Sequence, residues 1–137
     1  MIRIIHGEEG TGKTKQIIAL ANHISADIKG STVFIDTDNS YMYDLDYSIR
    51  FINSEEYAVS GPVAFEGFLG GLSASDNDLE YIFCDSFLRI VKEAPAALEE
   101  TFLWMEKFAD AHKLNIVLSV NENADQLPAF MQAYIKD

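Results

Sequence analysis

A glycine-rich loop with one lysine and one threonine follows directly behind the apolar opening of the chain. Residues 7–14 read GEEGTGKT, which places Gly7, four further residues, and then Gly12, Lys13 and Thr14 in the GxxxxGK[ST] spacing. Glycines allow backbone angles that other residues avoid, so successive N–H groups can turn inward around phosphate oxygens. The lysine adds a mobile positive charge, and the threonine hydroxyl can bind Mg²⁺. The spacing therefore predicts a site for the phosphates of a nucleotide.

The segments on both sides of this loop suit the same chemistry. A β-branched run, residues 2–5, precedes the loop, and residues 13–26 carry apolar side chains at helical spacing. A helix that begins where the loop ends points the positive end of its dipole at bound phosphate. The alternative is a flexible glycine turn that binds nothing, and this context disfavours it. We expect the whole loop and the first helical turn to bind the nucleotide, through Gly7, Glu8, Glu9, Gly10, Thr11, Gly12, Lys13, Thr14 and Lys15.

An aspartate closes the apolar run LEYIFCD at residue 85. A carboxylate at the end of a buried strand is where enzymes with such a loop hold Mg²⁺ through water, so Thr14 and Asp85 are the predicted metal residues. The alternative is that Asp85 is an acidic cap for the following segment, SFLRIV. The neighbouring Cys84 is the only cysteine, so no internal disulfide can form, and its apolar surroundings indicate a buried, inert thiol.

Composition and charge limit the classes of partner. The chain has 137 residues, of which 48% are hydrophobic, enough for a packed core in one domain, residues 1–137. Its 22 Asp and Glu against 10 Lys and Arg give a net charge of -12, which repels a phosphate backbone and disfavours nucleic acid. A nucleotide with Mg²⁺ stays compatible, because the metal, Lys13 and the loop amides offset its charge locally. With no run of about eighteen apolar residues and no signal-peptide pattern, we expect no membrane association and a cytoplasmic location.

Short apolar runs alternate with helical patterns along the whole chain. This alternation predicts an α/β fold with a parallel five-stranded sheet flanked by helices. The expected strands are 2–5, 32–35, 48–52, 81–84 and 115–120, and the expected helices are 13–26, about 62–72, about 95–112 and about 124–135. Parallel strands bring their carboxyl ends to one edge of the sheet, where ligands bind. We therefore expect the residues that follow the strands to meet there: Gly7, Asp36, Asp38, Asp85, Ser86 and Asn121.

Three stretches follow the loop in a recognisable order: STVFIDTDNSYMYDLD, then SIRFINSEEYAVSGPVAFEGFLGGL, then LEYIFCDSF. Over residues 1 to about 122 this order resembles the RecA-like recombinase and circadian-clock branch of P-loop ATPases. The resemblance implies ATP and Mg²⁺ as cofactors, with Lys13 in the catalytic set, Asp38 in the place of the catalytic glutamate, and Asn121 as a polar sensor of the γ-phosphate. It also implies the strand order third, second, fourth, fifth, first. That order leaves the first strand as an open edge, where self-association or a protein partner is an option.

Two features of the sequence lead us to expect slow hydrolysis. Asp38 is one methylene shorter than the glutamate of that family, and a positioning error of about 1 Å can cost on the order of a hundredfold in rate. None of the three arginines has an evident place as a finger that reaches a neighbour's γ-phosphate, although Arg89, just beyond the apolar run, stays open as a candidate. Glu9 and Glu66 are the next candidates for a base if Asp38 is structural.

The leading prediction is a minimal RecA-like domain that binds ATP and hydrolyses it slowly. A second interpretation is a non-catalytic ATP-binding regulatory or assembly partner, in which Asp38 is a solvated turn residue. A third is a small-molecule kinase, which the sequence disfavours because the segment between the fourth and fifth strands has no lid with several arginines. Tyr41, Tyr43 and Tyr47 are expected to cover the sheet edge rather than to stack on a base or contact a partner.

Overall fold

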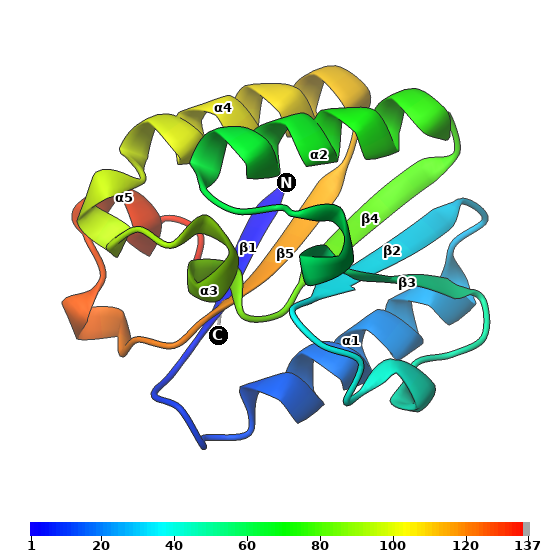
Figure 1. Cartoon of the computed structure of the whole chain (residues 1–137), viewed down its shortest axis with the longest axis horizontal. Helices are drawn as coiled ribbons and strands as arrows, with labels where there is room; N and C mark the ends of the chain where they lie inside the picture. Colours follow the sequence, from blue (N-terminus) through cyan, green and yellow to red (C-terminus); the bar gives the residue numbers. More distant parts are fainter. Residues whose placement is uncertain (136–137) are drawn as a thin grey trace.

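A five-stranded sheet forms the centre of the computed structural model, which describes residues 1–135 (Figure 1). All neighbouring strands are parallel, and their order is β1-β5-β4-β2-β3. The predicted α/β class with a parallel five-stranded sheet is confirmed, and the order is the one that the resemblance implied. The strands are β1 (Ile2–His6), β2 (Ser31–Asp36), β3 (Ile49–Asn53), β4 (Leu79–Cys84) and β5 (Asn115–Val120).

Helices cover both faces of the sheet. The long helix α1 lies on one face, and α2 and α4 lie on the other (Figure 1). Shorter helices complete the connections. The α-helices are α1 (Lys13–Asp27), α2 (Pro62–Ser75), α3 (Phe87–Val91), α4 (Glu99–His112) and α5 (Ala129–Gln132). The 3₁₀ turns are η1 (Met42–Asp44), η2 (Ser54–Tyr57), η3 (Pro95–Ala97) and η4 (Ala124–Gln126).

The two faces of the sheet hold two separate apolar clusters, because successive side chains of a strand point to opposite sides. On β1, Ile5 belongs to the cluster that contains Ile17 of α1. Its neighbour Ile4 belongs to the larger cluster, together with Phe65 of α2 and Phe102 of α4. Burial on both faces explains why the strands read as continuous apolar runs in the sequence.

The C-terminal part of the chain differs from the prediction. The expected helix over 124–135 is wrong, because the structure has the turn η4 and the single-turn helix α5 instead. Pro128 lies between them, and a proline disfavours helical angles in the residue before it. Leu127 is accordingly extended, with φ -84° and ψ 143°. The helix expected from about residue 95 begins only at Glu99, after the turn η3.

The edge strand β1 is partly covered. The backbone N–H of Ile4 donates to the carbonyl of Tyr134 at 2.8 Å, and Ile4 and Ile135 form a parallel bridge. The expectation of an open edge is therefore wrong at the middle of the strand, where the segment after α5 pairs with it.

In residues 1–135 no helix combines the length and the apolar character that a membrane crossing requires.

The tyrosines after β2 lie in an exposed loop. Tyr43 and Tyr47 are 90% and 102% exposed, so the expectation that they cover the sheet edge is wrong for both. The turn η1 interrupts their alternate spacing. Asn22 of α1 fixes this loop, since its side chain donates to the carbonyl of Asp44 at 3.0 Å and accepts the N–H of Asp46 at 2.7 Å.

Candidate functional site

The loop between β1 and α1 depends on glycine at two positions. Gly7 has φ +145°, and a Cβ there would lie 2.7 Å from Oγ1 of Thr11, so a larger residue would displace the loop. Gly12 caps α1 with φ +87° and ψ 16°, a left-handed conformation that favours glycine. The N–H of Gly7 donates to the carbonyl of Glu122, after β5, at 2.9 Å. The loop is thereby attached to the carboxyl edge of the sheet.

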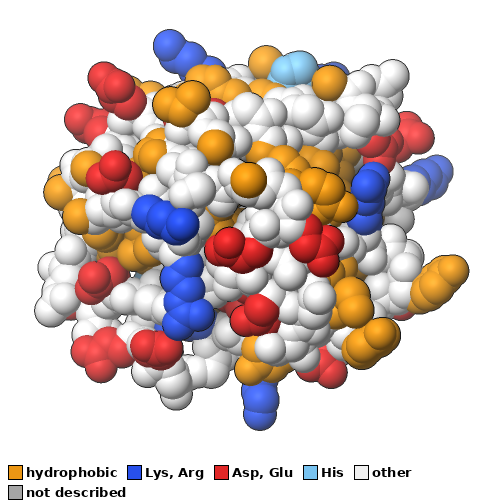
Figure 2. All heavy atoms as spheres, viewed as in Figure 1, with side chains coloured by type: hydrophobic (Ala, Val, Ile, Leu, Met, Phe, Trp, Pro, Cys, Tyr) orange, Lys and Arg blue, Asp and Glu red, His pale blue; other side chains and the backbone are white. Residues whose placement is uncertain are grey.

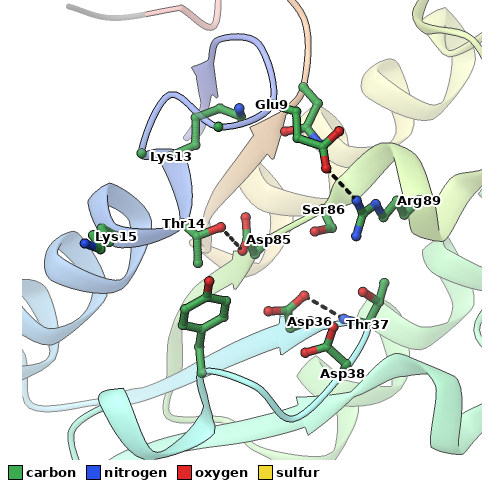
Figure 3. Close-up of a pocket in the computed structure, with 14 residues that line it drawn as sticks. Glu9, Lys13, Thr14, Lys15, Asp36, Thr37, Asp38, Asp85, Ser86 and Arg89 are labelled. Atoms are coloured by element: carbon green, nitrogen blue, oxygen red, sulfur yellow. Dashed lines mark hydrogen bonds and ion pairs between the residues drawn. The ribbon is translucent and has the colours of Figure 1, made fainter.

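Lys13 folds back over this loop. Its ammonium Nζ donates to the carbonyl of Glu8 at 2.6 Å and to Oγ1 of Thr11 at 3.4 Å, and the residue is buried. Burial lowers the pKa of Lys13, while the charges of Asp85 and Glu9 act in the opposite direction. The positive charge therefore lies inside the curve of the loop (Figure 3).

Asp85 links three elements at the carboxyl edge. Its Oδ2 accepts a hydrogen bond from the hydroxyl of Thr14, in the first turn of α1, at 2.9 Å. Its Oδ1 accepts one from the hydroxyl of Ser119 on β5, and the same Ser119 oxygen accepts the N–H of Ser86 at 2.9 Å. The two predicted metal residues are thus in direct contact. The N-cap of α3 is Ser86, with no side-chain cap, so Asp85 does not cap that helix.

Asp36 is a site residue to which the sequence analysis gave no role. It is the last residue of β2 and is buried, with its Oδ1 accepting the N–H of Thr37 at 2.7 Å. Burial raises its pKa to about 7; the charges of Asp85 and Asp38 add to the rise, and the Thr37 bond and Arg89 oppose it. Ile35 pairs with Cys84 in the sheet register, so Asp36 and Asp85 come next on adjacent strands. Two neighbouring runs that both end in aspartate, FID and FCD, were the available signal.

Asp38 lies at the cavity but is exposed, unlike Asp36. Its Oδ1 accepts the N–H of Ser40 at 2.9 Å, and bonds with Ser40 hold the pKa of the Asp38 carboxyl below its usual value. Figure 3 shows Asp36 and Asp38 side by side below the Thr14–Asp85 pair. Asn121 follows β5 and also lines the cavity, whereas Glu66 lies on α2 and does not. The catalytic roles of Lys13, Asp38 and Asn121 stay predictions.

These residues surround one cavity of about 470 Å³ at the carboxyl edge of the sheet. Of the predicted nucleotide-binding residues, six line it, while Gly7, Glu8 and Thr11 shape the loop behind it. The cavity also includes residues that the sequence analysis did not assign to binding. Its lining is Glu9, Gly10, Gly12, Lys13, Thr14, Lys15, Asp36, Thr37, Asp38, Tyr41, Asp85, Ser86, Arg89 and Asn121.

No protein-family model and no curated protein matches this chain. Within residues 1–135 there is also no group of three or more His, Cys, Asp or Glu side chains able to hold a metal ion by themselves.

Proposed function

We propose that this chain is a Mg²⁺-dependent ATP-binding protein of the RecA-like P-loop class that hydrolyses ATP slowly. The observation that carries the proposal is the 2.9 Å hydrogen bond between the Thr14 hydroxyl and Asp85 Oδ2. The two residues are separated by 71 positions, and each was assigned to the metal from its own motif. Their meeting beside a glycine loop and a buried lysine is the arrangement that a Mg²⁺-nucleotide needs.

Each residue of the loop region has a distinct role in this proposal. The N–H groups of the loop and of the first turn of α1 bind phosphate oxygens, and Lys13 turns from the Glu8 carbonyl to the β- and γ-phosphates. The hydroxyl of Thr14 is a direct Mg²⁺ ligand, and Asp85 holds a water of the ion. Mg²⁺ neutralises phosphate charge, which matters in a cavity lined by four carboxylates, Glu9, Asp36, Asp38 and Asp85.

A second candidate function is non-catalytic ATP binding. The conformation of Asp38 favours it, because this side chain lies in an exposed turn and its Oδ1 already accepts the N–H of Ser40. In the ATPase, Asp38 orients the attacking water; in the binding module, ATP orders the domain for a protein partner. Turnover of an Asp38 variant separates the two functions.

The charge pattern supports a nucleotide rather than a nucleic acid as the ligand. Acidic and basic side chains of residues 1–135 are interspersed on the face shown in Figure 2. The protein as a whole carries a net charge of -12, which repels a phosphate backbone. The proposal also places the protein in the cytoplasm, where ATP and Mg²⁺ are abundant and a free thiol such as Cys84 stays reduced.

Calorimetric titration with ATP tests the proposal. We expect saturable binding with Mg²⁺, weaker binding without it, and a loss of affinity of at least about tenfold in Lys13→Ala, because charge-assisted bonds to phosphate are lost. Lys107→Ala is the matched control, since Lys107 is an exposed lysine of α4 outside the cavity. If folded Lys13→Ala protein binds ATP as tightly as the unmodified protein, the assignment of this loop to phosphate binding is wrong.

A further inference from the structure

Arg89 faces the phosphate loop from the opposite side of the cavity. Its Nη2 lies 3.2 Å from Oε1 of Glu9, the third residue of the loop, and both residues line the cavity. Figure 3 shows Arg89 between Glu9 above and the Asp36–Asp38 pair below. Lys15, the other exposed cation of the cavity, lies on the far side of Thr14 in the same view. The guanidinium is therefore a strong positive charge between the loop and the aspartates.

The backbone of Arg89 is held in place by its neighbours, while its side chain is exposed. Phe87, Ile90 and Val91 of α3 are buried and hold the helix against the sheet. The N–H of Arg89 donates to the carbonyl of Ser86 at 3.0 Å, and Ser86 is itself attached to β5 through Ser119. The side chain of Arg89, by contrast, is 57% exposed. A rigid base with a long, exposed side chain lets the guanidinium change partner without any change in the fold.

The bond to Glu9 is easily exchanged. The Glu9 side chain is 79% exposed, and pairs this exposed are weak because water and salt screen them. The terminal phosphate of a nucleotide is a stronger partner, since it carries more charge than a carboxylate and accepts the two parallel N–H bonds of a guanidinium.

The position of Lys13 shows which end of a nucleotide Arg89 would meet. In this type of loop the lysine ammonium reaches the β- and γ-phosphates. Here that ammonium lies 2.6 Å from the carbonyl of Glu8, and the next residue is Glu9, the partner of Arg89. Lys13 would have to turn only from the Glu8 carbonyl to reach these phosphates, so a γ-phosphate bound there would lie within reach of Arg89.

Given the proposed function, we propose that Arg89 binds the γ-phosphate of ATP within its own chain and gives up Glu9 to do so. ADP has no γ-phosphate, so Arg89 stays with Glu9 when ADP is bound. The link between the loop and α3 is then present with ADP and absent with ATP. Arg89 therefore distinguishes the two nucleotides, without an arginine from a neighbouring molecule.

Calorimetric affinities for Mg²⁺-ATP and Mg²⁺-ADP test this assignment. We expect Arg89→Ala to weaken ATP binding by about 10- to 100-fold, the value of a lost charge-assisted contact, and to change ADP binding by less than about threefold. Arg89→Lys keeps the positive charge but loses the paired N–H groups of the guanidinium. Its ATP affinity should fall between those of the unmodified protein and of Arg89→Ala. The matched control is Arg50→Ala, which removes an exposed arginine of β3 that does not line the cavity.

Glu9→Gln separates this role from that of a simple clamp. If the Glu9–Arg89 pair only orders the loop, both Glu9→Gln and Arg89→Ala weaken ATP and ADP alike, and the assignment is wrong. If Arg89 moves to the γ-phosphate, Glu9→Gln strengthens ATP binding more than ADP binding, because it removes the competitor. Glu9→Gln also removes a negative charge near all the phosphates, and the double variant Glu9→Gln/Arg89→Ala measures that contribution separately.

The two proposals fail in different ways. If the unmodified protein binds neither nucleotide, the proposed function is wrong and the assignment of Arg89 falls with it. If the protein binds ATP through Lys13 but Arg89→Ala leaves the ratio of ATP to ADP affinity unchanged, the proposed function stands and the assignment of Arg89 is wrong.

Discussion

Replacement of Asp36 by asparagine should stabilise the protein, and the gain should grow with pH. Asp36 is buried at the end of β2, and burial raises the pKa of its carboxyl from 3.8 to about 7. Asparagine has the shape of the protonated carboxyl, and its amide oxygen can still accept the N–H of Thr37. Asp36→Asn therefore replaces a group that ionises near neutral pH with one that does not.

The sign and size of the effect come from the difference between the two states. The folded protein holds the Asp36 proton more tightly than the unfolded chain does. The contribution of Asp36 to the free energy of unfolding is therefore fully present below pH 3.8 and is lost as the pH rises to about 7. At about 1.4 kcal/mol per pKa unit, the full loss is about 4 kcal/mol. At pH 5.5 about 2 kcal/mol of this stability has already been lost. The gain in the free energy of unfolding from Asp36→Asn should therefore roughly double between pH 5.5 and pH 8.

Urea unfolding of both proteins from pH 5.5 to 8 measures this difference and cancels the titration of the groups that do not interact with Asp36. Asp38→Asn is the control, because Asp38 is exposed and its pKa is lowered; that change should give no gain in stability that grows with pH. A free-energy difference between Asp36→Asn and the unmodified protein that is flat across this range would refute the reasoning.

Two further predictions concern the site. Ser119→Ala should lower the free energy of unfolding by about 1–3 kcal/mol, because the N–H of Ser86 and one oxygen of Asp85 lose a buried partner; urea unfolding beside the exposed Ser60→Ala control checks this, and equal midpoints would contradict it. Steady-state release of phosphate from Mg²⁺-ATP should be slow, and it should fall further in Asp38→Asn with ATP affinity little changed. If Asp38→Asn hydrolyses ATP as fast as the unmodified protein, Asp38 is a turn residue.

The strands of the sheet followed from signals that are strong in a single sequence, whereas their order followed from the resemblance to a known family. Short apolar runs separated by helical patterns predicted all five strands to within a few residues, because both faces of this sheet are buried. The short helices were missed because they contain too few residues to give a clear pattern. Helix α3 spans five residues, too few for a periodic pattern, and α5 is limited by Pro128. The spacing of the tyrosines led us to expect that they cover the sheet edge, but the loop that carries them is fixed by Asn22, far away in the sequence.

For the candidate site, the sequence located the strand ends but not the environment of each side chain. Asp36 and Asp38 are two positions apart and have the same chemistry, yet one is buried and the other exposed. That difference depends on β4 lying beside β2, which places Asp85 next to Asp36. The contact between Glu9 and Arg89 joins residues 80 positions apart and could be found only once the chain was folded.

The position of β1 has a consequence for how the protein acquires its fold. Among the five strands of the described residues 1–135, β1 pairs with β5 alone, and the ammonium of Met1 bonds to the carbonyl of Leu114, 113 positions later. The glycine loop after β1 is therefore synthesised long before β5, the strand that pairs with β1. Strands so far apart in the sequence pair slowly, and an unpaired apolar strand such as β1 is prone to aggregate until it pairs with β5. The proposed nucleotide site should consequently form late in folding, and ATP should have little effect on the early steps.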